Sequence, residues 1–129
     1  MNKPTVILQS VLLIALAFCF ATSTTIAQDM AKVAPNNVKV LLDNDKVRVL
    51  DVQFKTGEKL PMHSHPNHVL YAMINGKVKT TLADGKVVDT EIKAGEARWN
   101  DAVTHANEAL ADGHVLIVEM KEHKMMKKK

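Results

Sequence analysis

The stretch GEKLPMHSHPNHVLYAMING, residues 57–76, decides the fold. Its segment 59–65 has the pattern of a short strand and carries two histidines one residue apart, His63 and His65. Side chains at positions i and i+2 of a strand point to the same face of the sheet, so the two imidazoles project together. The stretch ends in Asn75-Gly76, which favours a tight hairpin turn because both residues tolerate positive φ. These features predict β-structure that presents a pair of imidazoles on one face.

The rest of the chain repeats this pattern of short strands and turns. Further turn signals are Asp84-Gly85, Ala94-Gly95 and Asp112-Gly113. Between them, residues with high β propensity alternate with polar ones, which predicts strands at 47–54, 78–82, 86–92 and 115–120. In the first of these, Arg48, Leu50, Val52 and Phe54 share one face. No window shows sustained helical periodicity. We therefore predict an all-β fold, a single antiparallel barrel of about eight or more strands, whose closure removes exposed strand edges.

The N-terminus has the pattern of a secretory signal peptide, residues 1–27. Lys3 supplies a positive charge, and residues 11–21 form an apolar run that is too short to span a bilayer. An uncleaved membrane anchor is the alternative. Cleavage after Ala27 would leave a lead-in at 28–37, a barrel at 38–121 and a basic tail at 122–129. We expect an exported protein, periplasmic or secreted, with no stable membrane insertion once the signal is removed.

Composition excludes several classes of function. The single cysteine, Cys19, would leave with the signal peptide, so the mature chain would have neither a disulfide nor a thiolate ligand. Without Lys3 the chain has 16 basic and 14 acidic residues, a net charge of +2, which does not favour nucleic-acid binding. The tail contains His123, Met125 and Met126 among lysines. These are soft ligands that suit Cu(I), although a solvated basic tail is the simpler interpretation.

Two motifs in the chain resemble those of the cupin superfamily. In the first, Gly57, His63, His65 and Gly76 fall in register with the Gly, His-x-His and Gly of that family. The second is GEARWNDAVTHANEA, residues 95–109, with a third histidine, His105. The resemblance covers residues 45–121, and implies a jelly-roll barrel with a metal or ligand site in its mouth. It also implies a possible homodimer.

The sequence departs from the family pattern at two places. Val69 occupies the position of the Glu that serves as the fourth metal ligand in the family. His68, immediately before it, is a possible replacement: it would face away from His65 in a straight strand, but Pro66 interrupts the strand and can re-aim it. The second motif is one residue short between its glycine and His105.

The predicted site is a mononuclear centre for a divalent metal ion. The expected ligands are His63, His65 and His105, with His68 as a possible fourth. Imidazole suits several metals, so Fe, Zn, Mn, Ni and Cu all remain candidates.

Other residues are candidates for chemistry beside the metal. Tyr71 and Glu108 are the candidate catalytic residues, and Tyr71 would face the lumen if Val69 does. Arg98 is a candidate for binding a carboxylate, and Trp99 for packing or for a ligand wall.

Two functions are compatible with this sequence. The first is metal-dependent turnover of a small polar molecule, of the oxygenase or isomerase type that the resemblance includes. The second is a non-catalytic module that binds a small ligand or a metal. Fold resemblance alone does not distinguish them.

Overall fold

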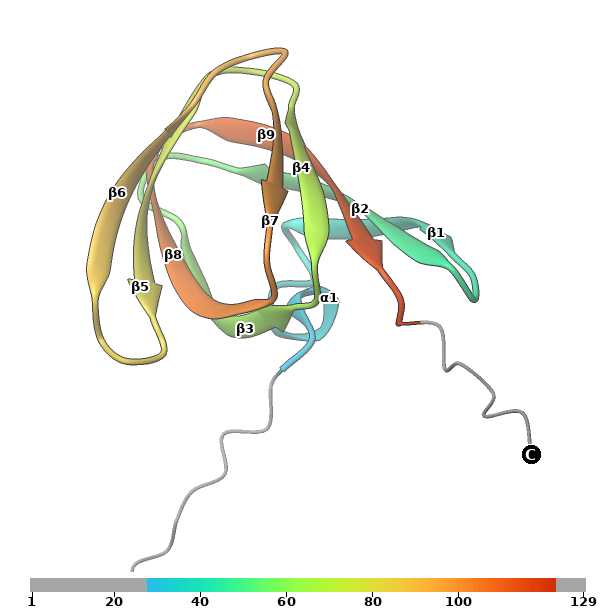
Figure 1. Cartoon of the computed structure of the whole chain (residues 1–129). Helices are drawn as coiled ribbons and strands as arrows, with labels where there is room; N and C mark the ends of the chain where they lie inside the picture. Colours follow the sequence, from blue (N-terminus) through green and yellow to red (C-terminus); the bar gives the residue numbers. More distant parts are fainter. Residues whose placement is uncertain (1–27, 123–129) are drawn as a thin grey trace, which may run out of the picture.

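The computed structural model of the chain describes residues 28–122, which form nine strands and one short helix (Figure 1). The strands are β1 (Val38–Asp43), β2 (Val47–Phe54), β3 (Lys59–His65), β4 (His68–Ala72), β5 (Gly76–Leu82), β6 (Val87–Ile92), β7 (Ala97–Asn100), β8 (Val103–Ala111) and β9 (Gly113–Met120). The predicted strands at 47–54 and 59–65 coincide with β2 and β3. The other three predicted strands overlap β5, β6 and β9.

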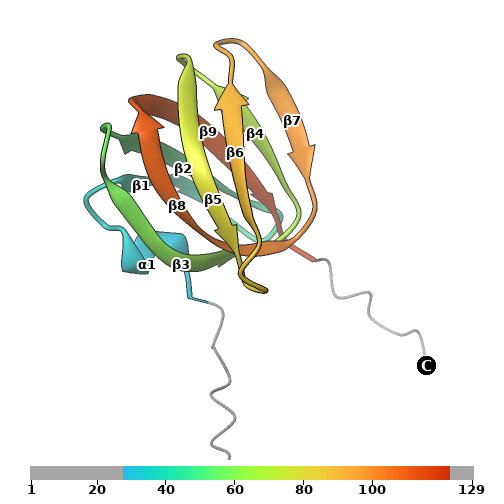
Figure 2. The same ribbon diagram turned by 90° about the vertical axis from the view of Figure 1, so that its left-hand side faces the viewer.

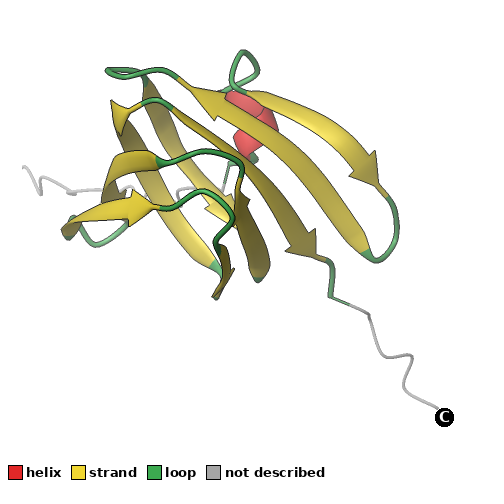
Figure 3. Cartoon of the chain, turned by 90° about the horizontal axis from the view of Figure 1, so that it is seen from above, coloured by secondary structure: helices red, strands yellow, loops and turns green. Residues whose placement is uncertain are grey.

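The strands form two antiparallel sheets that face each other (Figures 1 and 2). One has the order β1-β2-β9-β4-β7 and the other β3-β8-β5-β6. Successive strands often lie in different sheets, which is the arrangement of a jelly roll. Seen from above, the two sheets wrap around a common interior (Figure 3). This architecture confirms the predicted all-β jelly-roll barrel.

Strands β2 and β9 supply one wall of the interior. Their register aligns Phe54 with Gly113, Val52 with Val115, Leu50 with Ile117, and Arg48 with Glu119. Because alternate side chains of a strand share a face, all four pairs point inward. Leu50, Val52 and Phe54, which the alternation in this segment places on one face, are buried. The same face therefore changes from apolar at one end to charged at the other.

A bulge in β3 sets the direction of the histidines. Leu60 pairs with Asn107 and His63 with His105, so β3 has one residue more than β8 between these two pairs. Residues three apart in a regular strand face opposite sides, yet Leu60 and His63 are both buried. The extra residue allows this, since a bulge re-aims the side chains that follow it. Pro61 lies within the bulge, where its missing N–H costs no ladder hydrogen bond.

Helix α1 (Met30–Val33) lies in the predicted lead-in and packs beside β3 (Figure 1). Asp29 caps its N-terminus by accepting a hydrogen bond from the Ala31 N–H at 3.0 Å. The backbone N–H of Ser64 donates to the Gln28 carbonyl at 2.9 Å, which fixes the start of the segment against β3.

Within residues 28–122, no helix is both long and apolar enough to cross a membrane. The predicted signal peptide, 1–27, and residues 123–129 of the predicted tail lie outside the described residues.

Candidate metal centre

Three histidines from two neighbouring strands meet on the inner face of the smaller sheet. His63 lies directly opposite His105 in the β3–β8 register, and their ring centroids are 4.7 Å apart. His65, two residues along β3, has its ring centroid 4.9 Å from that of His63 and 5.5 Å from that of His105. One ring nitrogen of each lies within 4.8 Å of those of the other two, so the three can share one metal ion. The structure thus brings together the three histidines predicted as ligands.

The hydrogen bonding of His63 leaves one nitrogen free for a metal. Nδ1 donates to the carbonyl oxygen of Pro61, inside the bulge, at 2.7 Å. The proton on Nδ1 makes Nε2 the acceptor nitrogen of the neutral ring. Among the described residues, His63 Nε2 is the only buried side-chain nitrogen or oxygen that has no hydrogen-bond partner. An unpaired buried acceptor is costly, and a metal ion would satisfy it.

His65 is held from behind by a chain of charged groups. Its Nδ1 donates to Glu119 Oε1 at 2.7 Å, and Arg48 Nε donates to Glu119 Oε2 at 2.7 Å. The other two guanidinium nitrogens of Arg48 donate to both carboxylate oxygens of Asp29, at 2.7 and 2.9 Å. A carboxylate behind a histidine fixes its tautomer and makes the opposite nitrogen a stronger metal ligand. Glu119 therefore orients His65 so that Nε2 is the free nitrogen.

His68 lies beside His65 but outside the group of three. The ring centroids of His65 and His68 are 4.8 Å apart, and His68 Nδ1 donates to the Pro66 carbonyl at 2.8 Å. The turn at Pro66 directs both side chains into the interior, as the sequence suggested. Since the group of mutually close ligand atoms includes only His63, His65 and His105, His68 is placed as a neighbour of the site.

Burial keeps His63, His68 and His105 in the neutral form that binds metals. It lowers the pKa of His63 and of His68 below the ordinary value of 6.5. Burial, together with the neighbouring histidines, lowers the pKa of His105 to about 3. Hydrogen bonds from His65 and Arg48 outweigh the effect of burial on Glu119 and hold its pKa below the usual range. At neutral pH His63, His68 and His105 are thus uncharged, and the ionised carboxylate of Glu119 lies behind His65, which suits a cation.

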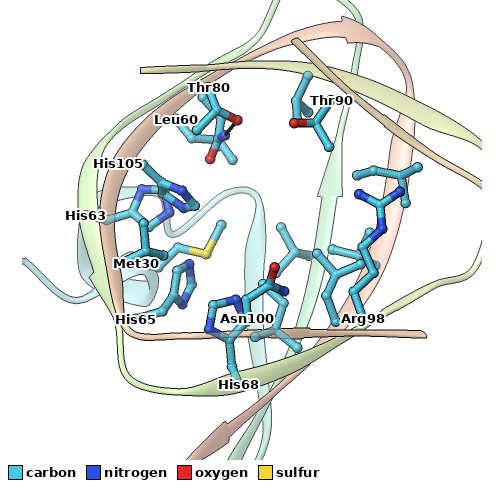
Figure 4. A pocket seen from close by; sticks show the side chains of 18 of the residues that line it. Met30, Leu60, His63, His65, His68, Thr80, Thr90, Arg98, Asn100 and His105 are labelled. Atoms are coloured by element: carbon cyan, nitrogen blue, oxygen red, sulfur yellow. Dashed lines mark hydrogen bonds between the residues drawn. The ribbon is translucent and has the colours of Figure 1, made fainter. Parts of the chain in front are cut away.

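The histidines line one wall of a cavity of about 500 Å³ (Figure 4). Arg98 lies across the cavity from them and Asn100 lies beside His68, while Thr80 and Thr90 lie toward another side. Arg98 is paired with Glu96 at 2.6 Å, which neutralises much of its charge. The cavity is therefore large enough for a small organic molecule and offers it hydroxyl and amide groups near the histidines.

The structure does not bring the two candidate catalytic residues into this cavity. Tyr71 is 42% exposed, and its strand directs Leu70 inward instead. Val69 lies on the same face of β4 as Tyr71 and does not line the cavity. The expectation that Tyr71 faces the lumen depended on an inward-facing Val69, so it is wrong. Glu108 lies between the inward residues Asn107 and Ala109 on β8, so it points to the outer face. Trp99 lines the cavity mouth although it is 57% exposed.

Sequence reasoning missed three residues of the site: Arg48, Glu119 and Met30. Arg48 and Glu119 each interrupt an inward-facing apolar series, and a charged residue on the buried face of a strand is a signal that could have found them. Met30 comes from the lead-in, which has no periodicity. Only the packing of α1 places Met30 in the cavity wall.

No protein-family model and no curated protein matches this sequence. The similar solved structures include a cupin domain from Bordetella pertussis Tohama I, with a TM-score of 0.59 and 21% identity, covering 66% of this chain and 92% of that one. A cupin superfamily protein from Desulfitobacterium hafniense DCB-2 has a TM-score of 0.52 and 16% identity, covering 66% of this chain and 76% of that one. A Streptococcus pyogenes protein of unknown function has a TM-score of 0.52 and 17% identity, covering 67% and 74%. At these identities the likeness establishes a cupin fold and no activity.

Proposed function

We propose that this chain is an exported protein of cupin fold that binds one divalent metal ion through His63, His65 and His105. The observation that carries the proposal is His63 Nε2, a buried nitrogen that has no hydrogen-bond partner and lies beside the two other histidines. Each of His63 and His65 has its Nδ1 proton fixed by an oxygen acceptor, so both present the opposite nitrogen without rearrangement. Three imidazoles leave coordination positions open for water or a ligand.

The residues around the metal have separable roles in this proposal. Glu119 keeps the proton on His65 Nδ1, and Arg48 keeps Glu119 ionised and in place. The cavity admits a small polar molecule, with Asn107 held by Thr80 at 2.9 Å among its polar lining groups. A bound divalent metal would supply Lewis acidity at this point.

A non-catalytic binding module is the second candidate, and the positions of Tyr71 and Glu108 favour it. Both lie outside the cavity, so neither can transfer a proton to a molecule bound there. Screening small polar compounds against metal-loaded protein distinguishes the two candidates. Turnover detected by mass spectrometry supports the enzyme, whereas thermal stabilisation by a compound that is recovered unchanged supports the module.

The first test is elemental analysis of the untagged protein, purified without chelator. We expect one metal ion per chain in the parent, and its loss in the double variant His63→Ala/His105→Ala. His114→Ala is the matched control, because His114 pairs with Asp51 at 2.6 Å and does not line the cavity. Absence of metal from the parent, even after divalent ions are added, would contradict the proposal.

A graded variant tests the role of the carboxylate behind His65. Glu119→Gln keeps the size of the side chain and removes its charge, so we expect the metal affinity to fall by roughly 10–100-fold, as is typical for such supporting groups. Unchanged affinity would show that Glu119 contributes to stability alone.

Export is proposed from the N-terminal sequence. The positive charge of Lys3, the apolar run 11–21 and the small residue Ala27 support cleavage after Ala27. Mass spectrometry of the protein recovered from a cell-envelope fraction tests this, because a mature chain would begin at Gln28. Full-length protein confined to the cytoplasm would contradict it.

A further inference from the structure

Met30, which is not among the proposed metal ligands, lies in the cavity wall beside the histidines. Met30 is 3% exposed and lines the same cavity as His63, His65 and His105. In Figure 4 its side chain projects between the rings of His63 and His65, with the sulfur toward the cavity. A thioether is a soft, polarisable group that serves both as a packing unit and as a metal ligand.

Met30 owes this position to the same charged groups that orient His65. Asp29, the residue before it, caps α1 and accepts two hydrogen bonds from Arg48. Arg48 also holds Glu119, which holds His65. One continuous network therefore fixes both a histidine of the site and the helix that carries Met30.

Among the described residues, no carboxylate joins the group of ligand atoms that face one another, since Glu119 lies behind His65. Within residues 28–122, the ligand atoms that lie mutually close come from His63, His65 and His105 alone. Asp101 lines the cavity, but its carboxylate accepts a hydrogen bond from the Trp99 indole at 3.1 Å. Hard cations such as Mg²⁺ and Mn²⁺ prefer oxygen ligands, whereas imidazole together with thioether suits copper, including Cu(I).

We propose that the sulfur of Met30 is a fourth donor of the His63–His65–His105 site, and that the site therefore selects copper and retains it as Cu(I). This inference rests on the proposed metal site, and it differs from the proposed function in one respect, because the copper would be held as monovalent Cu(I) and not as a divalent ion. In this proposal the Met30 sulfur serves as the fourth ligand in place of a Glu, because the position expected for that Glu is occupied by Val69. Met30 lies in the lead-in and not in the motif that contains Val69.

Cu(I) is the informative probe. Cu(II) binds more tightly than Zn(II) at almost any nitrogen site, so a preference for Cu(II) says nothing about Met30. Affinities for Cu(I) and for Zn(II) are therefore measured separately, by competition with a chromophoric chelator, and without oxygen for Cu(I). The background is the full chain with His123→Ala, Met125→Leu and Met126→Leu, so that the tail offers no soft ligands.

The test variant is Met30→Leu, which removes the sulfur and nearly conserves volume. We expect the Cu(I) affinity to fall by about tenfold or more while the Zn(II) affinity changes by less than about threefold, because only the soft ion gains from a thioether. Leu60→Met is the matched control: it adds a sulfur to another buried wall position, and both affinities should stay near those of the parent.

A second measurement detects the contact between Met30 and copper directly. In protein labelled with selenomethionine and loaded with Cu(I), X-ray absorption at the selenium edge should detect a copper neighbour, and Met30→Leu should abolish it. If metals bind but Met30→Leu leaves the Cu(I) affinity unchanged and no Se–Cu neighbour is seen, Met30 is a packing residue and this inference is wrong, while the metal site stands. If the parent binds neither ion, the proposed site and this inference both fail.

Discussion

The two ends of the face shared by β2 and β9 differ sharply although the same two strands build them. At one end the ring of Phe54 lies over Gly113, with Val52 and Val115 as the next pair. At the other end Arg48 and Glu119 form a buried ion pair behind His65. The first end depends on close packing and the second on paired charge. One alternating pattern of side chains can therefore supply both an apolar core and the support of a binding site.

Removing the positive charge at the polar end should have the largest effect on stability. Arg48→Met leaves the carboxylate of Glu119, 3% exposed in its side chain, without its charge partner. We expect the free energy of unfolding to fall by about 3–5 kcal/mol, which is typical when one member of a buried pair is lost. Urea denaturation of the metal-free protein measures this.

Two further variants sharpen that result. Adding Glu119→Leu to Arg48→Met should restore much of the stability, because no buried charge is then left unpaired. Lys55→Met breaks the exposed pair with Asp112 and should cost less than about 1 kcal/mol. Equal losses for Arg48→Met and Lys55→Met would show that burial of the pair does not matter.

At the apolar end, Gly113→Ala should destabilise through overlap of atoms. A Cβ at this position would lie 2.1 Å from Cζ of Phe54, so the ring must move. We expect a loss of about 1–3 kcal/mol, as for other overpacked cores, with no change in metal content. Calorimetric unfolding and elemental analysis check the two halves of this prediction.

We attribute the loss of stability in Gly113→Ala to overlap with the Phe54 ring and not to backbone conformation. Gly113→Ala/Phe54→Leu should therefore recover part of the stability, since the smaller side chain frees room for the methyl group. Gly76→Ala is the control, because its Cβ would meet its nearest neighbour, the Asp112 carbonyl oxygen, at 3.4 Å, an ordinary contact distance. A similar loss in both single variants would refute the packing explanation.

The smallest expected effect concerns the turn that precedes Gly113. The Asp112 carboxylate accepts hydrogen bonds from the backbone N–H and the hydroxyl of Thr56, and with Lys55 these lower its pKa below 3.8. A lowered pKa stabilises the fold above the unfolded value, and the contribution is lost as the pH falls through the folded value. Asp112→Asn should thus lower the urea midpoint slightly at about pH 7 and leave it unchanged near pH 2. An equal shift at both pH values would exclude the charge as the cause.

Local pattern predicted much of this molecule correctly, because alternation with period two depends only on neighbouring residues. It placed β2 and β3, grouped Leu50, Val52 and Phe54 on one face, which is buried in the structure, and put His63 and His65 on one face of a strand. Turn chemistry was local too, but it was only partly correct. Gly85 and Gly95, both predicted in turns, adopt positive φ of 87° and 81°, whereas Gly76 and Gly113 begin strands β5 and β9 without positive φ.

Local pattern failed where the direction of a side chain depends on another segment. Tyr71 was expected in the lumen only if Val69, two residues before it, faced inward. Strand β4 pairs with β7 and β9 in such a way that His68 and Leu70 face the cavity instead. Arg48 and Glu119 were visible as charges among apolar residues, but their partnership joins positions 71 residues apart. Nothing in the lead-in indicated that Met30 would be buried.

The sequence pattern alone was enough to predict the all-β fold, the grouping of Leu50, Val52 and Phe54 on one face of β2, and the shared direction of His63 and His65. Each of these follows from short-range geometry. Only the tertiary structure decided that His105 lies opposite His63, that Glu119 supports His65, and that Met30 reaches the same cavity. These contacts depend on strand register, on the β3 bulge and on the packing of α1, all of which are set by pairing between distant segments.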